Sequence, residues 1–261
     1  MTVRFQLLGT GAGPGVPSFY CDCIACLEAK EKPHLARTRS GAVLDIGHER
    51  LLIDASPDLR SQLIKERIKS LDYLFITHWH YDHFGGIGDL EFYIKLSRKR
   101  PLRLFLPPGS VEEFRSAYPF LEDVFKIETW EFERTYQFGE VKLTGLPARH
   151  SIPTAGILLE AEKRVAYFTD TSGLPESTAE RIQGVDALIC DSTFHGENWY
   201  PHSHMSMVEA IKLGNMVRAE HTILTHLAMH YSTPTTVAQI EAELESYPNV
   251  SLAYDGMLIE L

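Results

Sequence analysis

The sequence predicts a layered α/β fold in one domain spanning residues 1–261, and two observations support this prediction. Short apolar runs that end at turn residues alternate with longer segments in which apolar residues recur at helical spacing. Neither a low-complexity linker nor an internal repeat interrupts them. Because 44% of the 261 residues are hydrophobic, the chain can bury a substantial core between sheets and helices.

The predicted strands are short, apolar and bounded by turn residues. In chain order they are Val3–Leu8, Ala42–Ile46, Arg50–Ile53, Tyr73–Ile76, Leu104–Leu106, Val141–Leu146, Gly156–Leu159, Val165–Phe168, Ala187–Cys190, Thr222–Leu224 and Ser251–Ala253.

The predicted helices lie between these strands. They are Pro57–Glu66, Ile87–Leu96, Val111–Tyr118, Glu176–Gln183, Met207–Asn215 and Thr235–Ser246. The fifth has a well-defined start, because Ser206 can cap its first turn and Glu209, three residues later, can complete a capping box. Gly214 lies near its end, where glycine is common.

The amino-acid composition narrows the kinds of molecule that the protein is expected to bind. The formal net charge of −10 opposes binding to polyanions, which depends on Lys and Arg neutralising phosphates, so a long nucleic acid is disfavoured. No apolar stretch reaches the roughly 18 residues of a membrane-spanning helix, and the opening MTVRFQLLGTG lacks the features of a signal peptide. We therefore expect a soluble cytoplasmic protein without a membrane partner; a homodimer stays open.

The strongest chemical signal is the segment 77–83 (THWHYDH), directly after the predicted strand Tyr73–Ile76. Residues two apart in an extended stretch point the same way, so His78 and His80 can bind one ion. If the chain then turns into a helix, Asp82 and His83 are displaced sideways and can reach a second ion. Three imidazoles and a carboxylate in so short a segment are hard to explain as a solvated loop.

Three further candidate ligands also follow predicted strands: His150, Asp170 and His226. Each alone would be a weak signal, since a lone histidine is more often a surface or core residue and Asp170 could cap the next segment. Loops at the ends of adjacent strands, however, converge at one edge of a sheet. We therefore expect these residues to join the motif at residues 78–83 in one site.

This pattern resembles the signature of the metallo-β-lactamase-fold hydrolases, which His78, His80, Asp82 and His83 match. Other segments resemble the PhnP-like branch, the cyclic phosphate phosphodiesterases of phosphonate metabolism. These segments are Leu8-Gly9-Thr10-Gly11, Gly15-Val16-Pro17 with the cysteines that follow, residues 169–175 (TDTSGLP), Leu224-Thr225-His226 and Asp255-Gly256-Met257. The resemblance spans nearly the whole chain. It implies an αββα sandwich, with two mixed β-sheets flanked by helices and the site at one edge.

The resemblance also implies a ligand set for two catalytic ions. By position, His78, His80 and His150 would hold one ion, Asp82, His83 and His226 the other, and Asp170 would bridge them. Two ions about 3.5–4 Å apart can activate a water and stabilise both the phosphate and the leaving oxygen. Mixed histidine and carboxylate ligands suit Mn, Zn or Fe, and we favour Mn or Zn. We expect Asp82 to serve catalysis as well as metal binding.

Breaking a phosphodiester leaves an alkoxide that needs a proton, and histidine titrates in the useful range. His204 lies in the segment 201–206 (PHSHMS), just ahead of a predicted helix. By position it resembles the histidine assigned as general acid in PhnP-like enzymes. His202 and His195 are nearby competitors, and we interpret His202 as an exposed loop residue.

Cys21, Cys23 and Cys26 are too closely spaced to indicate a disulfide framework, and their pattern indicates a metal site. A structural zinc site normally has four protein ligands. The resemblance implies that a histidine shortly after the last active-site ligand completes the site, and His230 lies four residues beyond His226.

Other residues receive weaker interpretations. His34 is a less favoured fourth zinc ligand, and Cys190 is expected to be a small buried hydrophobe. The glycine-rich loop Gly9–Gly15 can offer backbone amides to a phosphate, but its glycines can equally serve tight turns. The roles of Arg37 and Arg39 are left open.

The predicted function is hydrolysis of small cyclic phosphodiesters, such as ribose 1,2-cyclic phosphate or 2′,3′-cyclic nucleotides, by a two-metal centre. The first rival is an RNase Z-like tRNA 3′-processing endonuclease, which the acidic balance and the lack of a long insertion disfavour. The second is a PqqB-like metal-dependent oxidoreductase, but retention of all seven two-metal ligands favours hydrolysis. A third is a scaffold without activity, because a fold alone never establishes catalysis.

Overall fold

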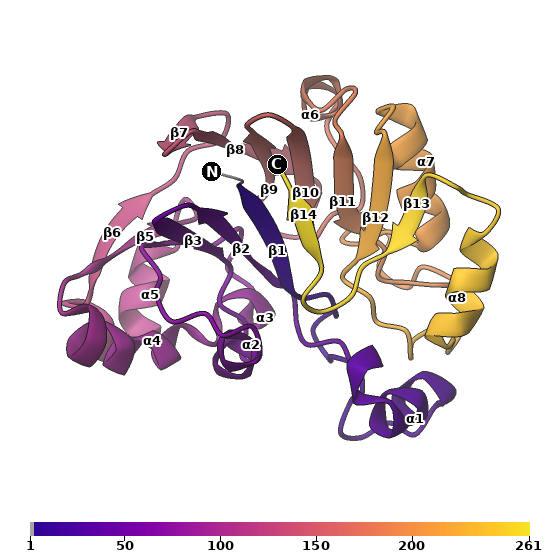
Figure 1. Cartoon of the computed structure of the whole chain (residues 1–261), viewed down its shortest axis with the longest axis horizontal. Helices are drawn as coiled ribbons and strands as arrows, with labels where there is room; N and C mark the ends of the chain where they lie inside the picture. The colour runs from indigo at the N-terminus through magenta and orange to yellow at the C-terminus, as the bar shows by residue number, and fades with distance from the viewer. Residues whose placement is uncertain (1–2) are drawn as a thin grey trace.

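Two β-sheets pack face to face at the centre of the molecule (Figure 1). In the part of the chain that the computed structural model describes, residues 3–261, each sheet has seven strands. Sheet 1 has the order β14-β1-β2-β3-β4-β5-β6, and sheet 2 has the order β13-β12-β11-β10-β9-β8-β7. Strands β3 to β6 are mutually parallel, as are β10 to β13, whereas the remaining pairs are antiparallel. Both sheets are therefore mixed, as predicted.

The strands of sheet 1 are β1 (Arg4–Gly9), β2 (Gly41–Ile46), β3 (Glu49–Ile53), β4 (Tyr73–Phe75), β5 (Leu102–Leu106), β6 (Phe125–Thr129) and β14 (Leu258–Glu260). Those of sheet 2 are β7 (Thr135–Phe138), β8 (Val141–Ala148), β9 (Thr154–Glu160), β10 (Arg164–Phe168), β11 (Ala187–Asp191), β12 (His221–Thr225) and β13 (Val250–Leu252).

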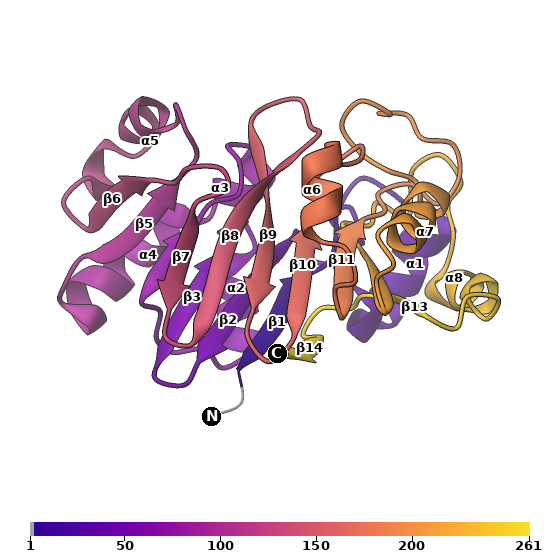
Figure 2. The same cartoon turned by 90° about the horizontal axis from the view of Figure 1, so that it is seen from above.

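Helices cover the outer face of each sheet (Figures 1 and 2). Next to sheet 1 lie α2 (Leu59–Lys65), α3 (Tyr81–Phe84), η2 (Ile87–Asp89), α4 (Leu90–Phe92), the π-helix η3 (Tyr93–Arg98), α5 (Val111–Ala117) and η4 (Pro119–Leu121). Next to sheet 2 lie α6 (Glu176–Arg181), α7 (Met207–Met216) and α8 (Val237–Leu244), while α1 (Ile24–Glu31) and η1 (Pro33–Leu35) project below the sheets. None of these helices is long and apolar enough to cross a membrane.

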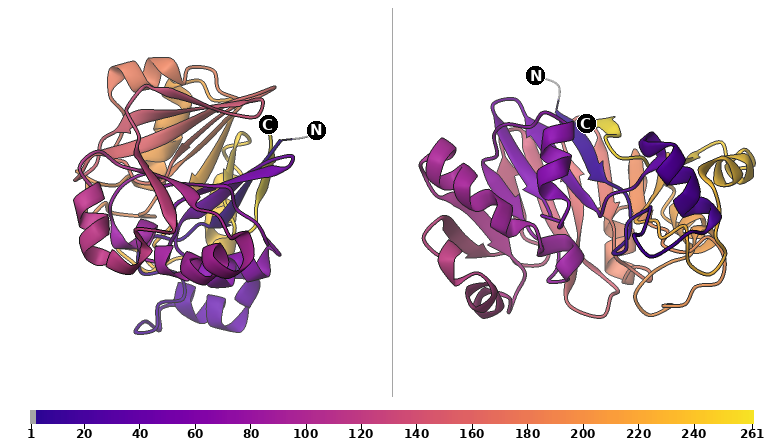
Figure 3. Two further views of the ribbon diagram at one scale, coloured as in Figure 1. Left: turned by 90° about the vertical axis from the view of Figure 1, so that its left-hand side faces the viewer. Right: turned by 90° about the horizontal axis from the view of Figure 1, so that it is seen from below.

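Three clusters of buried side chains hold these layers together. The central one fills the space between the sheets with residues such as Phe5, Phe75 and Tyr167, all nearly inaccessible to solvent. Phe75 also stacks on Trp130, with ring centroids 5.6 Å apart. The other two clusters lie between each sheet and its own helices. This order of helix, sheet, sheet and helix confirms the αββα sandwich (Figure 3, left).

Most predicted elements are confirmed with boundaries within about two residues, and the capping box of Ser206 and Glu209 at the start of α7 is present. The prediction missed β6, β7 and β14, and all three are edge strands. An edge strand pairs on one side only and leaves much of its surface exposed, so its hydrophobic pattern is weak. Helix α1 was also missed, because its buried residues are only Ala25, Cys26 and Ala29.

The single helix predicted over Ile87–Leu96 is wrong. The chain winds there as a 3-10 turn, one short α-helical turn and then the π-helix, which ends at Lys99 in the left-handed conformation. Ile87, Leu90 and Ile94 are still buried in the core. A 3-10 turn followed by an α-helical turn and a π-helix therefore buries the same apolar residues that suggested a single α-helix. Apolar spacing alone does not distinguish these windings.

Candidate metal centre

Seven predicted ligands meet at one edge of the two sheets, at the ends of strands and in the loops that follow them. His78 and His80 follow β4, and helix α3 then carries Asp82 and His83. His150, Asp170 and His226 follow β8, β10 and β12. Potential ligand atoms lie within 4.8 Å of one another in each of three overlapping groups: His78, His80 and His150; His78, His83 and Asp170; and Asp82, His83 and His226. The structure thus brings together the residues that the sequence assigned to two ions.

Asp170 lies between the two predicted ion positions. One of its carboxylate oxygens is 3.8 Å from Nε2 of His78 and 3.3 Å from Nε2 of His226, and the other is 3.0 Å from Nε2 of His83. Asp82 approaches the same histidines from the solvent side, with an oxygen 3.7 Å from Nε2 of His83 and 3.9 Å from Nε2 of His226. This arrangement fits the bridging role that we expected for Asp170.

Hydrogen bonds to Nδ1 fix the orientation of the ligand histidines. Nδ1 of His83 donates to Asp54 at 2.7 Å, and Nδ1 of His150 donates to the carbonyl of Ser203 at 2.8 Å. Nδ1 of His78 lies 3.0 Å from the hydroxyl of Thr77, which itself donates to Asp54. With Nδ1 carrying the proton, each ring directs Nε2 to the centre of the site, where its lone pair can bind a metal ion.

His226 has an equivalent support. Its Nδ1 lies 3.0 Å from the hydroxyl of Thr193, and that hydroxyl donates to Asp191 at 2.8 Å. His226 and Asp54 also both have positive φ angles, +57° and +61°, which non-glycine residues seldom adopt. Such strain persists where the surrounding structure imposes it, and here it occurs at a candidate ligand and at the support of another.

Several buried polar atoms at this centre need a partner. Within residues 3–261, Nε2 of His78, His83 and His226 and one oxygen of Asp170 make no hydrogen bond and are shielded from solvent. Leaving such atoms unsatisfied is costly, and they converge on one space. Imidazole nitrogens with carboxylate oxygens are ligands that Mn, Zn and Fe accept, so the residues fit divalent ions.

The electrostatics of the centre agree with this interpretation. Burial lowers the pKa of His78 well below its ordinary value, and burial also lowers the pKa of His80 and His150, so these rings are neutral. Burial opposes a charge on His83 as well, but the carboxylates of Asp170, Asp54 and Asp82 outweigh it and raise the pKa of His83 well above the ordinary value. The local field therefore favours a positive charge at this point.

His204, the predicted general acid, faces the same centre. Its ring lies 5.1 Å from the ring of His150 and 5.2 Å from that of His226, measured between centroids. Its Nδ1 donates to Asp191 at 2.8 Å, which directs Nε2 away from Asp191. Burial lowers the pKa of His204, but the adjacent Asp191 carboxylate outweighs it and raises the pKa to about 9. The ring is thus protonated at neutral pH and can donate from Nε2.

Asp191 is fully buried at the end of β11, and its carboxylate is held by other donors besides His204. One oxygen accepts hydrogen bonds from the backbone and hydroxyl of Thr193 and from the backbone of Met205, and the other accepts from the backbone of Thr171. Through Thr193 it supports His226 as well. Asp191 therefore fixes the general-acid candidate and a candidate metal ligand relative to each other.

Two other histidines were considered for the role of general acid, His195 and His202. His195 binds Glu243 on α8 through Nε2 at 2.9 Å, and His202 is exposed, as expected. The supports Asp54 and Asp191 were missed by the sequence analysis. Both directly follow or end an apolar strand, the same signal that singled out Asp170, so this signal could have revealed them.

The glycine-rich loop lies beside this centre, next to Asp82 and to the residue that follows His226. Its backbone pairs with the residue after His226, since the amide of Ala12 donates to the carbonyl of Leu227 at 3.1 Å. A Cβ on Gly13 would lie only 3.2 Å from an oxygen of Asp82. The side chain of Arg39 also stabilises the loop by donating a hydrogen bond to the carbonyl of Gly13 at 2.7 Å. A side chain at residue 13 would thus crowd Asp82, a candidate ligand, and glycine avoids this contact.

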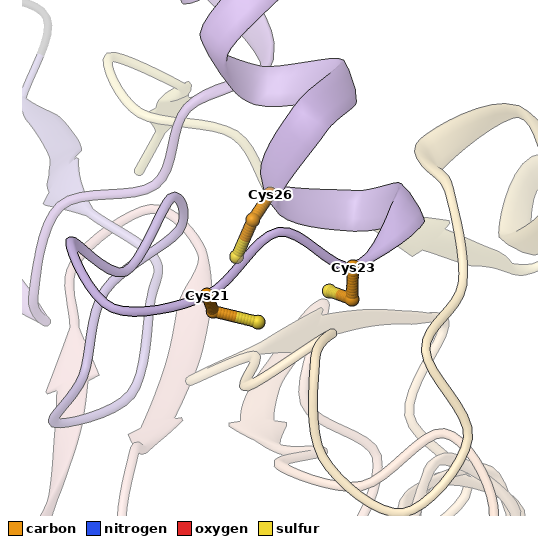
Figure 4. Close-up of side chains that lie close together, drawn as sticks. All are labelled: Cys21, Cys23 and Cys26. Carbon is orange, nitrogen blue, oxygen red and sulfur yellow. The ribbon is translucent and has the colours of Figure 1, made fainter.

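The three clustered cysteines form a second group, whose sulfur atoms point toward one another (Figure 4). The sulfurs of Cys21, Cys23 and Cys26 lie within 4.8 Å of one another, and no disulfide joins them among the described residues. Nδ1 of His230 lies 3.8 Å from the sulfur of Cys26, and both residues are buried. His34, the weaker candidate, is exposed on η1. Three sulfurs and one imidazole nitrogen suit a tetrahedral zinc site.

Comparison with known proteins identifies the family to which this chain belongs. The model of the β-lactamase superfamily domain matches residues 49–227. An octanoyltransferase of Porphyromonas gingivalis is 28% identical over 263 residues, covering 98% of this chain, which spans only 51% of that protein. The coenzyme PQQ synthesis protein B of Methylorubrum populi is 30% identical over 220 residues, with 72% of each protein covered. A ribonuclease Z of Bacteroides thetaiotaomicron is 23% identical over 282 residues, covering 84% of this chain and 88% of that protein.

Solved structures show the same fold. A diphosphatase from the PhnP family has a TM-score of 0.86 at 24% identity, covering 100% of this chain and 98% of that one. Zinc-bound PqqB from Methylobacterium extorquens has a TM-score of 0.81 at 23% identity, covering 99% and 100%. The fold and the clustered histidines and aspartates together imply binding of divalent metal ions. The chain therefore belongs to the β-lactamase superfamily and has the metallo-β-lactamase fold.

Proposed function

We propose that the protein is a metal-dependent phosphodiesterase that hydrolyses small cyclic phosphodiesters, such as ribose 1,2-cyclic phosphate or 2′,3′-cyclic nucleotides. The observation that carries the proposal is the position of His204. A protonated imidazole, held by Asp191, faces a cluster of seven candidate ligands and lies 5.1–5.2 Å from two of their rings. A site for ions beside a positioned acid suits cleavage of a bond whose leaving oxygen needs a proton.

We propose that His78, His80 and His150 hold one divalent ion, that Asp82, His83 and His226 hold the other, and that Asp170 is shared between them. Mn and Zn are the favoured metals. When bound, such ions lower the pKa of water and offset the negative charge of a phosphate. The protein's part is to keep the imidazoles of His78, His80 and His150 neutral through burial, and to orient the ligand rings through the hydrogen bonds to their Nδ1 atoms.

His204 supplies the proton for the leaving oxygen. Because Nδ1 is bonded to Asp191, the proton that is transferred is the one on Nε2. Asp191 stabilises the imidazolium before transfer and keeps the ring in place after it. The sugar alkoxide leaves as a neutral hydroxyl, and the product is a phosphomonoester.

We propose that the cysteine group with His230 binds one structural zinc. Burial raises the pKa of the Cys26 thiol to about 12, so a bound cation would be needed to hold it as a thiolate at neutral pH. A zinc ion here would fix the loop that precedes α1 next to the segment after β12, which carries both His226 and His230. Its role would be structural, with no position open to substrate.

The proposal is tested by removing the metals with a chelator, restoring Mn or Zn, and measuring hydrolysis of bis(p-nitrophenyl) phosphate, a 2′,3′-cyclic nucleotide and a ribose cyclic phosphate. Metal-restored hydrolysis of these diesters is expected. Two bound ions without hydrolysis of any of them would refute the proposal.

A second candidate is a metal-dependent oxidoreductase related to PqqB, which the 30% identity to coenzyme PQQ synthesis protein B favours. Iron dependence and oxygen consumption would support that candidate. For the RNase Z-like alternative, the net charge of −10 disfavours binding of a long RNA, and a precursor tRNA cleavage assay discriminates it.

A further inference from the structure

Five aromatic side chains, four of them exposed, come from the loop that carries His204 and from the segments around the cysteine group. We name Phe19, Tyr20, Trp199, Tyr200 and Tyr231 the aromatic shelf. Phe19 is 96% exposed, Tyr20 and Tyr200 are each 61% exposed, and Trp199 is 50% exposed. Water-exposed aromatic surface of this extent is uncommon on a monomer and typically marks a binding site.

The shelf is continuous. Trp199 stacks on Tyr231 with ring centroids 5.9 Å apart, and the hydroxyls of Tyr231 and Tyr20 are hydrogen-bonded at 3.0 Å. Phe19 meets Tyr20 edge-on at 5.0 Å. The shelf rests on the buried ring of Phe194, which lies 6.3 Å from Trp199 and 6.1 Å from Tyr200. The rings therefore form one surface and not scattered exposed residues.

One side of the shelf is fixed to the loop that carries His204. The side chain of Asn198 donates to the carbonyl of His204 at 2.8 Å and accepts from the amide of Tyr200 at 3.0 Å. The amides of Ser203 and His204 both donate to the carbonyl of Tyr200 at 2.9 Å. Trp199 and Tyr200 thus sit on the same hydrogen-bonded turn as the general acid, so their position relative to it is set.

The other side belongs to the segments around the cysteine group. Tyr231 directly follows His230 and lies five residues after His226, and Tyr20 directly precedes Cys21. Seen from below, the loop after β11 and the segment leading into α1 lie on the same side of the molecule (Figure 3, right). The shelf therefore joins three loops: the segment that leads into α1, the loop after β11 and the segment after β12.

We propose that the aromatic shelf stacks the heterocyclic base of a nucleotide-like substrate while its cyclic phosphate lies at the metal centre. This inference rests on the proposed function and selects, within that substrate class, diesters that carry a base over those that do not. The shelf residues carry no charge, which suits a flat neutral ring and not a second phosphate. The net charge of −10 disfavours a polymer, so one nucleotide is the occupant.

The test compares two substrates that differ only in the base: 2′,3′-cyclic AMP and methyl riboside 2,3-cyclic phosphate. The quantity measured is the ratio of their kcat/KM values on the metal-restored protein. Base stacking on an aromatic ring predicts that Trp199→Ala and Tyr20→Ala each lower this ratio by about 10-fold. Phe120→Ala removes another exposed aromatic, on η4 and outside the shelf, and is expected to leave the ratio unchanged. An unchanged ratio in both shelf variants would overturn the inference.

A binding measurement separates this inference from the proposed function. The chain has three tryptophans; Trp130 is fully buried, whereas Trp79 is partly buried and stacked on Phe84 at 4.0 Å, so comparison with Trp199→Ala identifies the signal of Trp199. Adenosine 3′-monophosphate should quench the fluorescence of the wild type and not that of Trp199→Ala, whether or not the protein hydrolyses diesters. Absence of quenching in the wild type would overturn the inference. So would a dimer in sedimentation that Trp199→Ala converts to monomer, because a second copy would then occupy the shelf.

Discussion

Replacing Asp191 with Asn tests the link between the buried carboxylate and the general acid. The pKa of His204 rises from the ordinary 6.5 to about 9, against the effect of burial, because Asp191 lies 2.8 Å from its Nδ1. At about 1.4 kcal/mol per pKa unit, this favours the protonated ring by roughly 3 kcal/mol. Asp170 and Asp82 also raise the pKa of His204, and bound cations would offset the contribution of these two carboxylates. The Asn side chain keeps the shape but removes the charge, so burial then brings the pKa of His204 to about 6.5 or below.

The sign of the pH dependence follows from the role of His204 as an acid. Activity requires the protonated ring, so it falls as pH rises through the pKa of His204. The alkaline limb of kcat should lie well above pH 7.5 in the wild type, because Asp191 raises the pKa of His204, and near pH 6.5 or below in Asp191→Asn. At pH 7.5 the protonated fraction falls from nearly all to about a tenth, which predicts roughly a 10-fold loss of kcat.

The assay is a pH profile of kcat on two substrates. A 2′,3′-cyclic nucleotide releases an alkoxide that needs a proton, whereas bis(p-nitrophenyl) phosphate releases a phenolate that does not. The loss at pH 7.5 should therefore appear with the cyclic nucleotide and be small with the nitrophenyl ester. Metal content is measured in parallel, because Asp191 also supports His226 through Thr193. An alkaline limb that does not move, in protein with its full metal content, would refute the reasoning.

Three further substitutions test other parts of the site. His204→Ala should slow hydrolysis of the cyclic nucleotide by about 100-fold or more without loss of metal, and unchanged turnover would remove His204 from the mechanism. Asp54→Asn removes the charge that orients His83 and should weaken metal binding by about 10- to 100-fold in a chelator competition, whereas unchanged affinity would contradict its supporting role. Cys26→Ser should remove one tightly held zinc per chain and lower the melting temperature while the catalytic ions stay bound; a wild type whose cysteines are reduced and metal-free would contradict the zinc site.

The sequence predicted much of the fold because its central strands are buried on both faces. Strands such as β10 and β11 have nearly continuous apolar runs, and these gave correct positions. Strands β6, β7 and β14 were missed because edge strands expose alternate residues and need little hydrophobic character. Pairing across the sheet, which decides whether such a segment becomes a strand, involves residues far apart in the chain.

The candidate ligands were predictable because five of them follow strands whose ends meet at one edge, and the other two, Asp82 and His83, lie on the short helix α3 directly after His80. The supports were not predicted, because their role depends on side-chain contacts between distant segments. Asp54 contacts His83, which lies 29 residues later in the sequence, and Thr193 contacts His226, which lies 33 residues later. The aromatic shelf was likewise not predicted, since Tyr20, Trp199 and Tyr231 come from three separate loops.

The central claim is that two divalent ions at this cluster enable hydrolysis of a small diester. The most direct measurement is the hydrolysis of 2′,3′-cyclic AMP by chelator-treated protein as Mn or Zn is added back, with bound metal measured in each sample. The account predicts that activity returns as the His and Asp centre fills to two ions per chain, and that the phosphomonoester is the product. Protein that holds both ions and leaves the cyclic nucleotide and the other small diesters intact would contradict it.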